Sequence, residues 1–389
     1  MSIPGIDEHF LDLEDPRVER TRRHDLREIV VIAMLAVICG ADHWAEIVQF
    51  GRAREKFLRG LLPLRHGIPG VDTFRRVFAA LDTDAFTRCF TAWTETLAGN
   101  TEGVLIAVDG KTLRRSFTLS DKSDPRHIVS AWAAKNRVVL AQVTTEAKSN
   151  EITAIPRLLA LLNLTGATIT IDAMGCQTAI ADGIRAKGAD YVLGLKNNQP
   201  TLYSEVEAAF ATVDIADEQL PAGAVHREDL QKVHGRTERR TITVLDVEER
   251  LSEAQLARWT DLQRIIRVES DRVVNEEHSQ ETRYYISSRV ADAASLAAMV
   301  RGHWGIENGQ HWVLDMAFDE DRARTRKKNA PDNFALLRRI ALNVLAHDKS
   351  KRVGTHGKRL KAGWDDEYLL SLLEAAGGAA NGDTGTHVG

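Results

Sequence analysis

VLIAVDG, at residues 104–110, is the first of three short apolar runs that decide the fold, and ATITIDA at 167–173 and ADYVLGLK at 189–196 are the others. Runs of this length, rich in Val, Ile and Leu, are typical of buried β-strands. Helix-like segments at 151–164 and 177–187 separate them. This alternation predicts helices covering a mainly parallel sheet.

Two more strand-like runs follow the first one. They are HIVSAWAAK at 127–135 and RVVLAQVTT at 137–145, and they are joined tightly around Asn136. The resulting order of three strands, helix, strand, helix and strand is that of a ribonuclease-H-like core. The predicted fold class is therefore α/β, with a ribonuclease-H-like mixed sheet flanked by helices.

The periodicity changes along the chain predict three parts. Residues 1–100 show apolar positions at helical spacing and are expected to form an all-α N-terminal module. Residues 101–350 are expected to form the α/β domain, with a β-rich insertion at about 213–288. Residues 351–389 are expected to form a basic and then Gly-rich tail, partly disordered.

Composition places the chain among ordinary soluble proteins. Hydrophobic residues make up 43% of the chain and charged residues 27%. The longest apolar run, 29–39, is too short to cross a bilayer and predicts a buried helix. Three widely spaced cysteines and the lack of a signal-peptide pattern favour a cytoplasmic location.

The net charge of −4 argues weakly against a nucleic-acid partner. However, residues 322–361 contain thirteen lysines and arginines against two acids, Asp332 and Asp348. Such a segment is suited to a polyanion, and a solvated basic helix face is the alternative.

Two carboxylates follow the strand-like runs. Asp109 is the second-last residue of VLIAVDG, and Asp172 is the second-last residue of ATITIDA. An isolated Asp there is more often a turn residue or helix cap. Two such acids at strand ends of one sheet repel each other unless cations lie between them, and Mg²⁺ or Mn²⁺ is the expected ion.

A third metal ligand is expected on the segment RGHWGIENGQHWVLDMAFDEDRAR. Glu307 is the candidate, because His303, Glu307 and His311 would share one face of a continuous α-helix. A structural carboxylate–histidine network is the alternative reading of this pattern, and Asp315 or Asp319 are alternative ligands.

Basic and polar residues near these acids are candidates for DNA contacts. Lys111, Arg114 and Arg115 lie just beyond Asp109. Strand alternation within HGRTERR allows only some of its cations to face DNA. The predicted contacts in this run and in the basic segment are His234, Arg236, Arg239, Arg322 and Arg324.

Several linked blocks closely resemble the H-repeat-associated insertion-sequence transposases of the DDE superfamily. These blocks are IAVDGKTLRRS, TITIDAMGCQ, DYVLGLKNNQPTL, HGRTERR and HWGIENGQHWVLDMAFDEDRAR. The resemblance runs from the helical N-terminal module to about residue 347. It implies a ribonuclease-H-like catalytic domain with a DDE metal triad at Asp109, Asp172 and Glu307, and a β-insertion before the third acid.

The resemblance also implies substrates, cofactors and partners. Two Mg²⁺ or Mn²⁺ ions per active site would drive cleavage at insertion-sequence ends and strand transfer. Because such a reaction uses two active sites on two ends, a homodimer is expected on element ends and target DNA, in the bacterial cytoplasm and nucleoid-associated when bound. Lys196, Asn198 and Gln199 are expected to face the substrate.

One departure concerns a helical series of Tyr, Arg, Glu and Lys that related transposases often have around the third acid. At these spacings the chain has Val300, His303, Glu307 and Leu314. His303 is expected to replace the Arg as a phosphate contact, whereas the Lys has no equivalent.

Two other functions fit parts of the pattern. A zinc hydrolase could use His303, Glu307 and His311, although this order differs from HExxH and leaves Asp109 and Asp172 without a role. Another metal-dependent nuclease or hydrolase would share the acids. A catalytically silent transposase-derived DNA-binding protein would keep the same fold.

Overall fold

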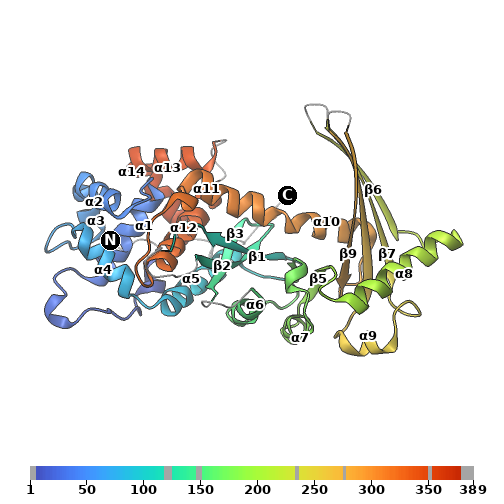
Figure 1. The fold of residues 1–389 in the computed structure, drawn as a ribbon. Coiled ribbons are helices and arrows are strands. Elements are labelled where there is room, and N and C mark those ends of the chain that lie inside the picture. Colours follow the sequence, from blue (N-terminus) through green and yellow to red (C-terminus); the bar gives the residue numbers. More distant parts are fainter. Residues whose placement is uncertain are drawn as a thin grey trace, which may run out of the picture. The chain divides into compact units, whose positions relative to one another are not determined.

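The computed structural model describes residues 6–117, 125–145, 151–232, 236–274, 277–348 and 353–377 (Figure 1). The chain divides into two compact units. Unit 1 comprises Met1–Asn100, Gly110–Lys148 and Glu307–Gly389, and unit 2 comprises Thr101–Asp109 and Ser149–Ile306. The two units therefore differ from the predicted parts 1–100, 101–350 and 351–389, because each unit combines segments that are separate in the sequence.

Unit 1 is mainly helical. Its central helices α1 and α12 are buried along almost their whole length. α1 is apolar on most faces, whereas α12 also buries polar residues such as Arg339, which pairs with Glu320. Asp25 caps α1 by accepting a hydrogen bond from the backbone N–H of Arg27 (2.7 Å). The helices of this unit are α1 (Leu26–Ile38), α2 (Trp44–Ala53), α3 (Glu55–Leu61), α4 (Val71–Ala80), α5 (Thr83–Ala98), α11 (Trp312–Phe318), α12 (Ala330–His347), α13 (Thr355–Trp364) and α14 (Asp366–Gly377).

Two of these helices correct the prediction for the end of the chain. Residues 355–377 form α13 and α14, where a tail was expected. The basic composition concealed the helical spacing of Tyr368, Leu369, Leu372 and Leu373, all of which are buried. The Gly-rich stretch beyond residue 377 lies outside the described residues.

The strands follow the order β3-β2-β1-β4-β5-β9-β8-β7-β6. β2 and β3 are antiparallel, whereas β1 pairs with β4 and β4 with β5 in parallel. This is the predicted ribonuclease-H-like order, so the fold class is confirmed. Its elements are β1 (Leu105–Leu113), β2 (Arg126–Ala133), β3 (Val138–Thr144), α6 (Glu151–Ala160), β4 (Thr168–Ile171), α7 (Thr178–Ala186) and β5 (Asp190–Leu195).

The predicted β-rich segment continues the same sheet in unit 2. β9 pairs antiparallel with β5, in the register Val192↔Ser287, and three long antiparallel strands follow it (Figure 1). The elements here are α8 (Pro200–Ala216), β6 (Val225–Lys232), β7 (Arg236–Asp246), α9 (Glu253–Arg258), β8 (Arg264–Val274), β9 (Glu277–Ser287) and α10 (Ala293–His303).

Two helices cover part of these long strands. Leu296 and Val300 of α10 pack on Val244 and Ile266, and Phe210 of α8 stacks on Tyr284 at 5.7 Å between ring centroids. Along β9, residues 277–282 are exposed and the residues from Tyr284 to Ser287 are mostly buried. The covered ends therefore anchor the long strands in unit 2.

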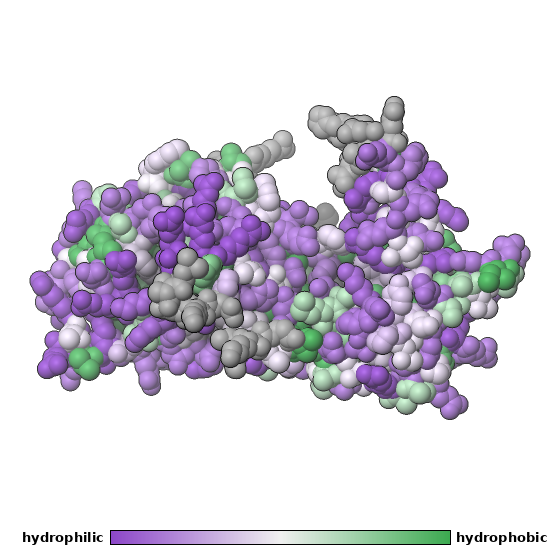
Figure 2. Space-filling model, viewed as in Figure 1, coloured by the Kyte–Doolittle hydropathy of each residue, from purple (hydrophilic) through white to green (hydrophobic). Residues whose placement is uncertain are grey.

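The surface is largely polar, as the face in Figure 2 shows. Large exposed hydrophobic residues are scattered, with Ile215 at 88% exposure among them. In the described part of the chain, none of the helices combines the length and apolar character needed to span a membrane. The predicted apolar helix at residues 29–39 is α1, and it is buried.

Candidate functional site

Asp109 and Asp172 occupy neighbouring parallel strands of unit 2. Val108 of β1 is in register with Ile171 of β4, and each aspartate directly follows one of these paired residues. The expectation that both acids end their strands is half right. β4 ends at Ile171, but β1 continues through Asp109 to Leu113.

The backbone fixes one oxygen of Asp172. Its Oδ1 accepts hydrogen bonds from the N–H groups of Met174 (3.0 Å) and Gly175 (3.3 Å), so the aspartate caps the short 3₁₀ helix η4 (Ala173–Gly175). The residue is exposed, and its Oδ2 has no hydrogen bond to any described residue. Asp172 is therefore oriented locally, with one oxygen available to a ligand.

Gly194 of β5 allows a close approach to this turn. A Cβ atom at position 194 would lie 3.0 Å from the backbone N of Ala173. Any larger residue would push the Asp172 loop away from β5. The sequence pattern does not reveal this requirement, because Gly194 lies within an otherwise ordinary apolar strand run.

Asn198 and Gln199 support the same loop from the other side. Asn198 Nδ2 donates to Ala173 O (2.6 Å), and Gln199 Nε2 donates to Cys176 O (3.0 Å). Their amide groups hold the loop here. Gln199 is buried and Asn198 is exposed, so a substrate contact by Asn198 remains a prediction. Lys196 is exposed, as a phosphate contact would be.

His303 lies near Asp172. Its Nδ1 is 3.1 Å from Thr170 Oγ1 on β4. Burial lowers the pKa of His303, although the charge of Asp172 acts in the opposite direction. The phosphate contact expected of His303 remains a prediction.

Glu307 opens a π-helical turn, η5 (Glu307–His311), in unit 1. It is exposed and has no ion pair or hydrogen bond with any described residue. The helix expected from the sequence is not a regular α-helix throughout, because α10 ends at His303 and the π-helical turn precedes α11. The α-helical spacing of His303, Glu307 and His311 is therefore interrupted at this turn, and their roles remain predictions. π-Helical turns are common at functional sites.

Asp315 is paired with a lysine. Lys111 Nζ lies 2.7 Å from both carboxylate oxygens of Asp315 and 3.4 Å from Asp321. The Lys111 side chain is only 9% exposed. Lys111 is thus an internal ion-pair partner, which corrects its expected role at DNA phosphates.

Seven exposed cations of unit 1 lie on two segments that touch each other. Arg326 Nε donates to Arg115 O (3.1 Å), and Arg114 Nε lies 3.2 Å from Asp321. The residues of this basic surface are Arg114, Arg115, Arg322, Arg324, Arg326, Lys327 and Lys328, all exposed.

Part of the basic segment is buried. Arg338, Arg339 and Arg359 are at most 2% exposed, and Arg339 lies 2.6 Å from the buried Glu320. These three arginines are therefore not available to DNA, whereas residues 322–328 carry exposed cations; Lys349, Lys351 and Arg352 lie outside the described residues.

On the long strands, Arg239 Nε lies 2.8 Å from Asp229, so its charge is shared with an acid. Arg236 lies at the start of β7, where its side chain is outside the described part of the structure. His234 is also outside the described residues.

Within the described residues, no group of three or more His, Cys, Asp or Glu side chains is close enough to hold a metal ion. The alternative zinc hydrolase site required His303, Glu307 and His311 at α-helical intervals. The π-helical turn interrupts this spacing.

The mixed α/β sheet, with Asp109 and Asp172 on neighbouring parallel strands, agrees with the expected DDE-type fold. Family models agree: DDE_Tnp_1-associated matches residues 7–94 and the Transposase DDE domain matches residues 100–344. The chain belongs to the DDE transposase family.

Curated relatives cover nearly the whole chain. The H repeat-associated putative transposase YhhI of Escherichia coli K12 is 35% identical over 97% of this chain and 100% of its own length. The putative transposase YncI of Escherichia coli O157:H7 is 38% identical over 96% of this chain and 95% of its own length. A piggyBac transposase synaptic complex with hairpin DNA is a distant structural neighbour, with a TM-score of 0.39, 12% identity, and coverage of 95% and 76% of the two chains.

Proposed function

We propose that this protein cleaves DNA at insertion-sequence ends and transfers the strands, with Asp109, Asp172 and Glu307 holding two Mg²⁺ or Mn²⁺ ions. The observation that carries the proposal is the placement of Asp109 and Asp172 at adjacent positions of parallel strands. Two neighbouring carboxylates are a suitable oxygen-donor set for a hard divalent cation. The family membership supports the same three residues.

The donor chemistry fits the ions. Asp172 keeps one oxygen without a hydrogen bond to the described residues, and Glu307 is exposed and unpaired among them. Lys111 neutralises Asp315, which makes Asp315 a poorer ligand. When bound, the two ions would lower the pKa of a water or 3′-hydroxyl and stabilise the leaving oxygen.

The side chains of this protein would then position and hold the reactants. The N–H groups of Met174 and Gly175 orient Asp172, and Gly194 lets β5 approach this turn. The basic surface of unit 1 would grip phosphates in a sequence-independent manner. The proposed partners are element ends and target DNA, with a homodimer acting on two ends in the bacterial cytoplasm.

The proposal is tested with Asp109→Asn and Asp172→Asn. The substrate is a supercoiled plasmid that carries the coding sequence with its native flanking DNA. We expect both variants to lose Mg²⁺-dependent cleavage at the element boundaries by more than about a hundredfold, since several kcal/mol of transition-state stabilisation is removed. DNA binding should persist.

Asp217→Asn is the matched control, because Asp217 is an exposed residue of unit 2 with a left-handed backbone (φ 48°) that Asn tolerates. Its cleavage should equal that of the unmodified protein. Near-normal cleavage by either triad variant would refute the metal assignment. DNA binding without cleavage by the unmodified protein would instead indicate a silent DNA-binding protein.

A further inference from the structure

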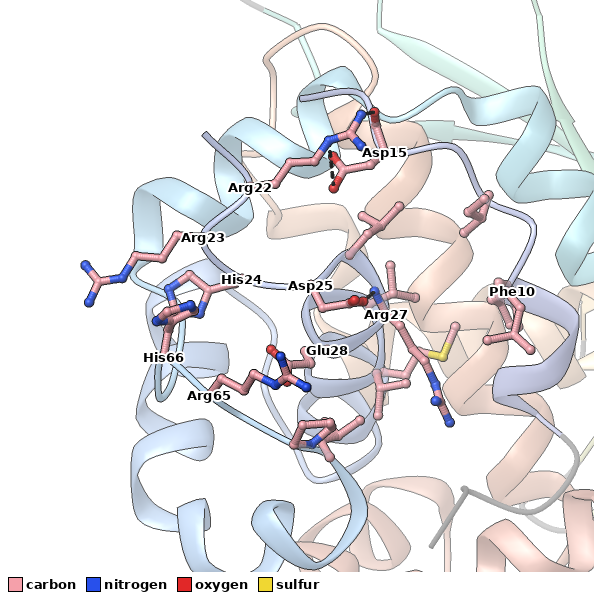
Figure 3. Close-up of a pocket in the computed structure, with 18 residues that line it drawn as sticks. Phe10, Asp15, Arg22, Arg23, His24, Asp25, Arg27, Glu28, Arg65 and His66 are labelled. Carbon is pink, nitrogen blue, oxygen red and sulfur yellow. Dashed lines mark hydrogen bonds and ion pairs between the residues drawn. The ribbon is translucent and has the colours of Figure 1, made fainter. Parts of the chain in front are cut away.

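A cavity of about 710 Å³ opens in the N-terminal helices of unit 1, well away in sequence from the triad (Figure 3). Its floor is apolar and includes Leu26, Val30 and Met34 of α1. Figure 3 shows Arg23, His24, His66 and Arg65 along one side and Phe10 on the opposite side. The volume is in the range of small-molecule binding sites.

A buried acid with an available oxygen lies in this cavity. Glu28 is 5% exposed, and its Oε1 accepts a hydrogen bond from the backbone N–H of Leu64 (2.6 Å). It has no ion pair with any described residue. Since a buried carboxylate with so few donors is costly, a ligand that donates a hydrogen bond would stabilise it.

His24 is a second incompletely partnered group in the lining. Its Nδ1 is buried without a hydrogen bond in the described part of the chain. The ring lies 6.2 Å from that of His66, edge to face. The cavity therefore presents two polar groups able to recognise the edge of a flat, polar ring.

The rim is cationic. Arg22, Arg23 and Arg65 are exposed, and Arg23 and Arg65 have no ion pair with any described residue. Asp15 and Asp25 are occupied, the former by Arg17 (2.6 Å) and the latter by the N–H of Arg27 (2.7 Å). This rim attracts phosphate and repels the amines or guanidinium groups that Glu28 alone would suit.

We propose that this cavity binds an unpaired nucleotide of a DNA strand, with an exocyclic amino group of the base on Glu28 and the phosphates against Arg23 and Arg65. An apolar floor below a ring of cations is accessible to a base only when the base is unstacked from a duplex. Carboxylates accept hydrogen bonds from the amino group of cytosine. The inference rests on the proposed function for its choice of DNA.

The test measures binding of fluorescein-labelled oligo-dC and oligo-dT by anisotropy. Both are pyrimidines, but cytosine carries an amino group where thymine carries a carbonyl. We expect oligo-dC to bind at least about tenfold more tightly, because one additional hydrogen bond to a charged group contributes about 1.5–3 kcal/mol. Glu28→Gln should remove the preference, because its amide can also donate to thymine and keeps the acceptor for Leu64. Arg65→Ala should weaken binding of both strands equally.

Glu95→Gln and Arg88→Ala are the matched controls, since both residues are exposed on α5 of the same unit. They should change neither the affinity nor the ratio. A Glu28→Gln protein that keeps the preference, or an unmodified protein without one, would overturn the proposal. Equal affinity for free dCMP and oligo-dC would show that the cavity binds a free nucleotide and not a DNA strand. Binding of a cationic peptide that depends on Glu28 would also contradict the proposal.

Cleavage of the flanked plasmid is measured in parallel. Cleavage by the unmodified protein without a base preference would remove the nucleotide site and leave the proposed function intact. A base preference that depends on Glu28, in a protein that does not cleave the plasmid, would support the nucleotide site and contradict the proposed function.

Discussion

Asp172 combines two roles that its sequence presented as alternatives. One oxygen caps η4, as an isolated strand-end Asp commonly does, and the other has no hydrogen bond to a described residue. The cap therefore does not compete with metal binding. It fixes the side-chain rotamer, which lowers the entropy cost of placing the second oxygen on an ion.

Glu307 and Asp315 can be distinguished by their partners. Glu307→Gln should reduce Mg²⁺-dependent cleavage by more than about a hundredfold, since a metal ligand is removed. Asp315→Asn should keep at least about a tenth of the activity, because Asp315 is committed to Lys111 (2.7 Å). Both are measured as initial cleavage rates on the flanked plasmid. An inactive, folded Asp315→Asn protein beside an active Glu307→Gln protein would move the third ligand to Asp315.

The segment that carries Glu307 is held by buried ion pairs further along the chain. Glu320, just after α11, lies 2.6 Å from Arg339 of α12, and both side chains are fully buried. Arg359 of α13 donates to Ala317 O and stacks over Phe318 at 4.2 Å. The end of α11 is thus fixed to α12 and α13 within unit 1.

Breaking the Glu320–Arg339 pair should destabilise unit 1. Glu320→Gln leaves a buried guanidinium without its counter-charge, so we expect the free energy of unfolding to fall by about 3–5 kcal/mol. Urea denaturation measures this. Asp72→Asn is the control, because Asp72 is 77% exposed and 3.9 Å from Arg75. It should change stability by no more than about 0.5 kcal/mol.

The pH dependence of this pair has a definite sign. Burial alone would raise the pKa of Glu320, but the charges of Arg339 and Arg338 lower it below its usual value. A carboxyl with a lowered pKa in the folded state contributes stability above its ordinary pKa and loses it as pH falls through the lowered value. Glu320→Gln should therefore reduce the acid sensitivity of unfolding. An unchanged pH profile would contradict this assignment.

At the scale of the whole molecule, the net charge of −4 conceals a local basic surface. Seven exposed cations gather on two touching segments of unit 1, whereas Arg338, Arg339 and Arg359 are buried. Binding to duplex DNA should therefore depend on a few exposed arginines and weaken steeply with salt.

Changing Arg322, Arg324 and Arg326 together to Gln should lower the slope of log affinity against log salt by about 0.9 for each DNA phosphate that the protein no longer neutralises. Fluorescence anisotropy with a random duplex at several salt concentrations measures the slope. Arg20, Arg52 and Arg75 are exposed elsewhere on unit 1 and provide a control triple with the same charge change. Equal slopes for the two triple variants would show that the basic surface is solvated and does not contact DNA phosphates.

The sequence by itself determined the strand order, the family and the neighbouring aspartates. Apolar runs specify buried strands, and the acids beside them are read directly from the chain. It also located the β-rich segment, although only pairing between β5 and β9 revealed that this segment continues the main sheet.

The tertiary structure alone decided which polar groups are available. Lys111 and Gln199 are polar residues of the kind that contact DNA, but Lys111 is paired with Asp315 and only 9% exposed, and Gln199 is buried against the Asp172 loop. The π-helical turn at Glu307 and the helices over 355–377 were also not evident from the pattern. The physical reason is that ion pairing and burial depend on residues distant in sequence, whereas periodicity reports only local spacing.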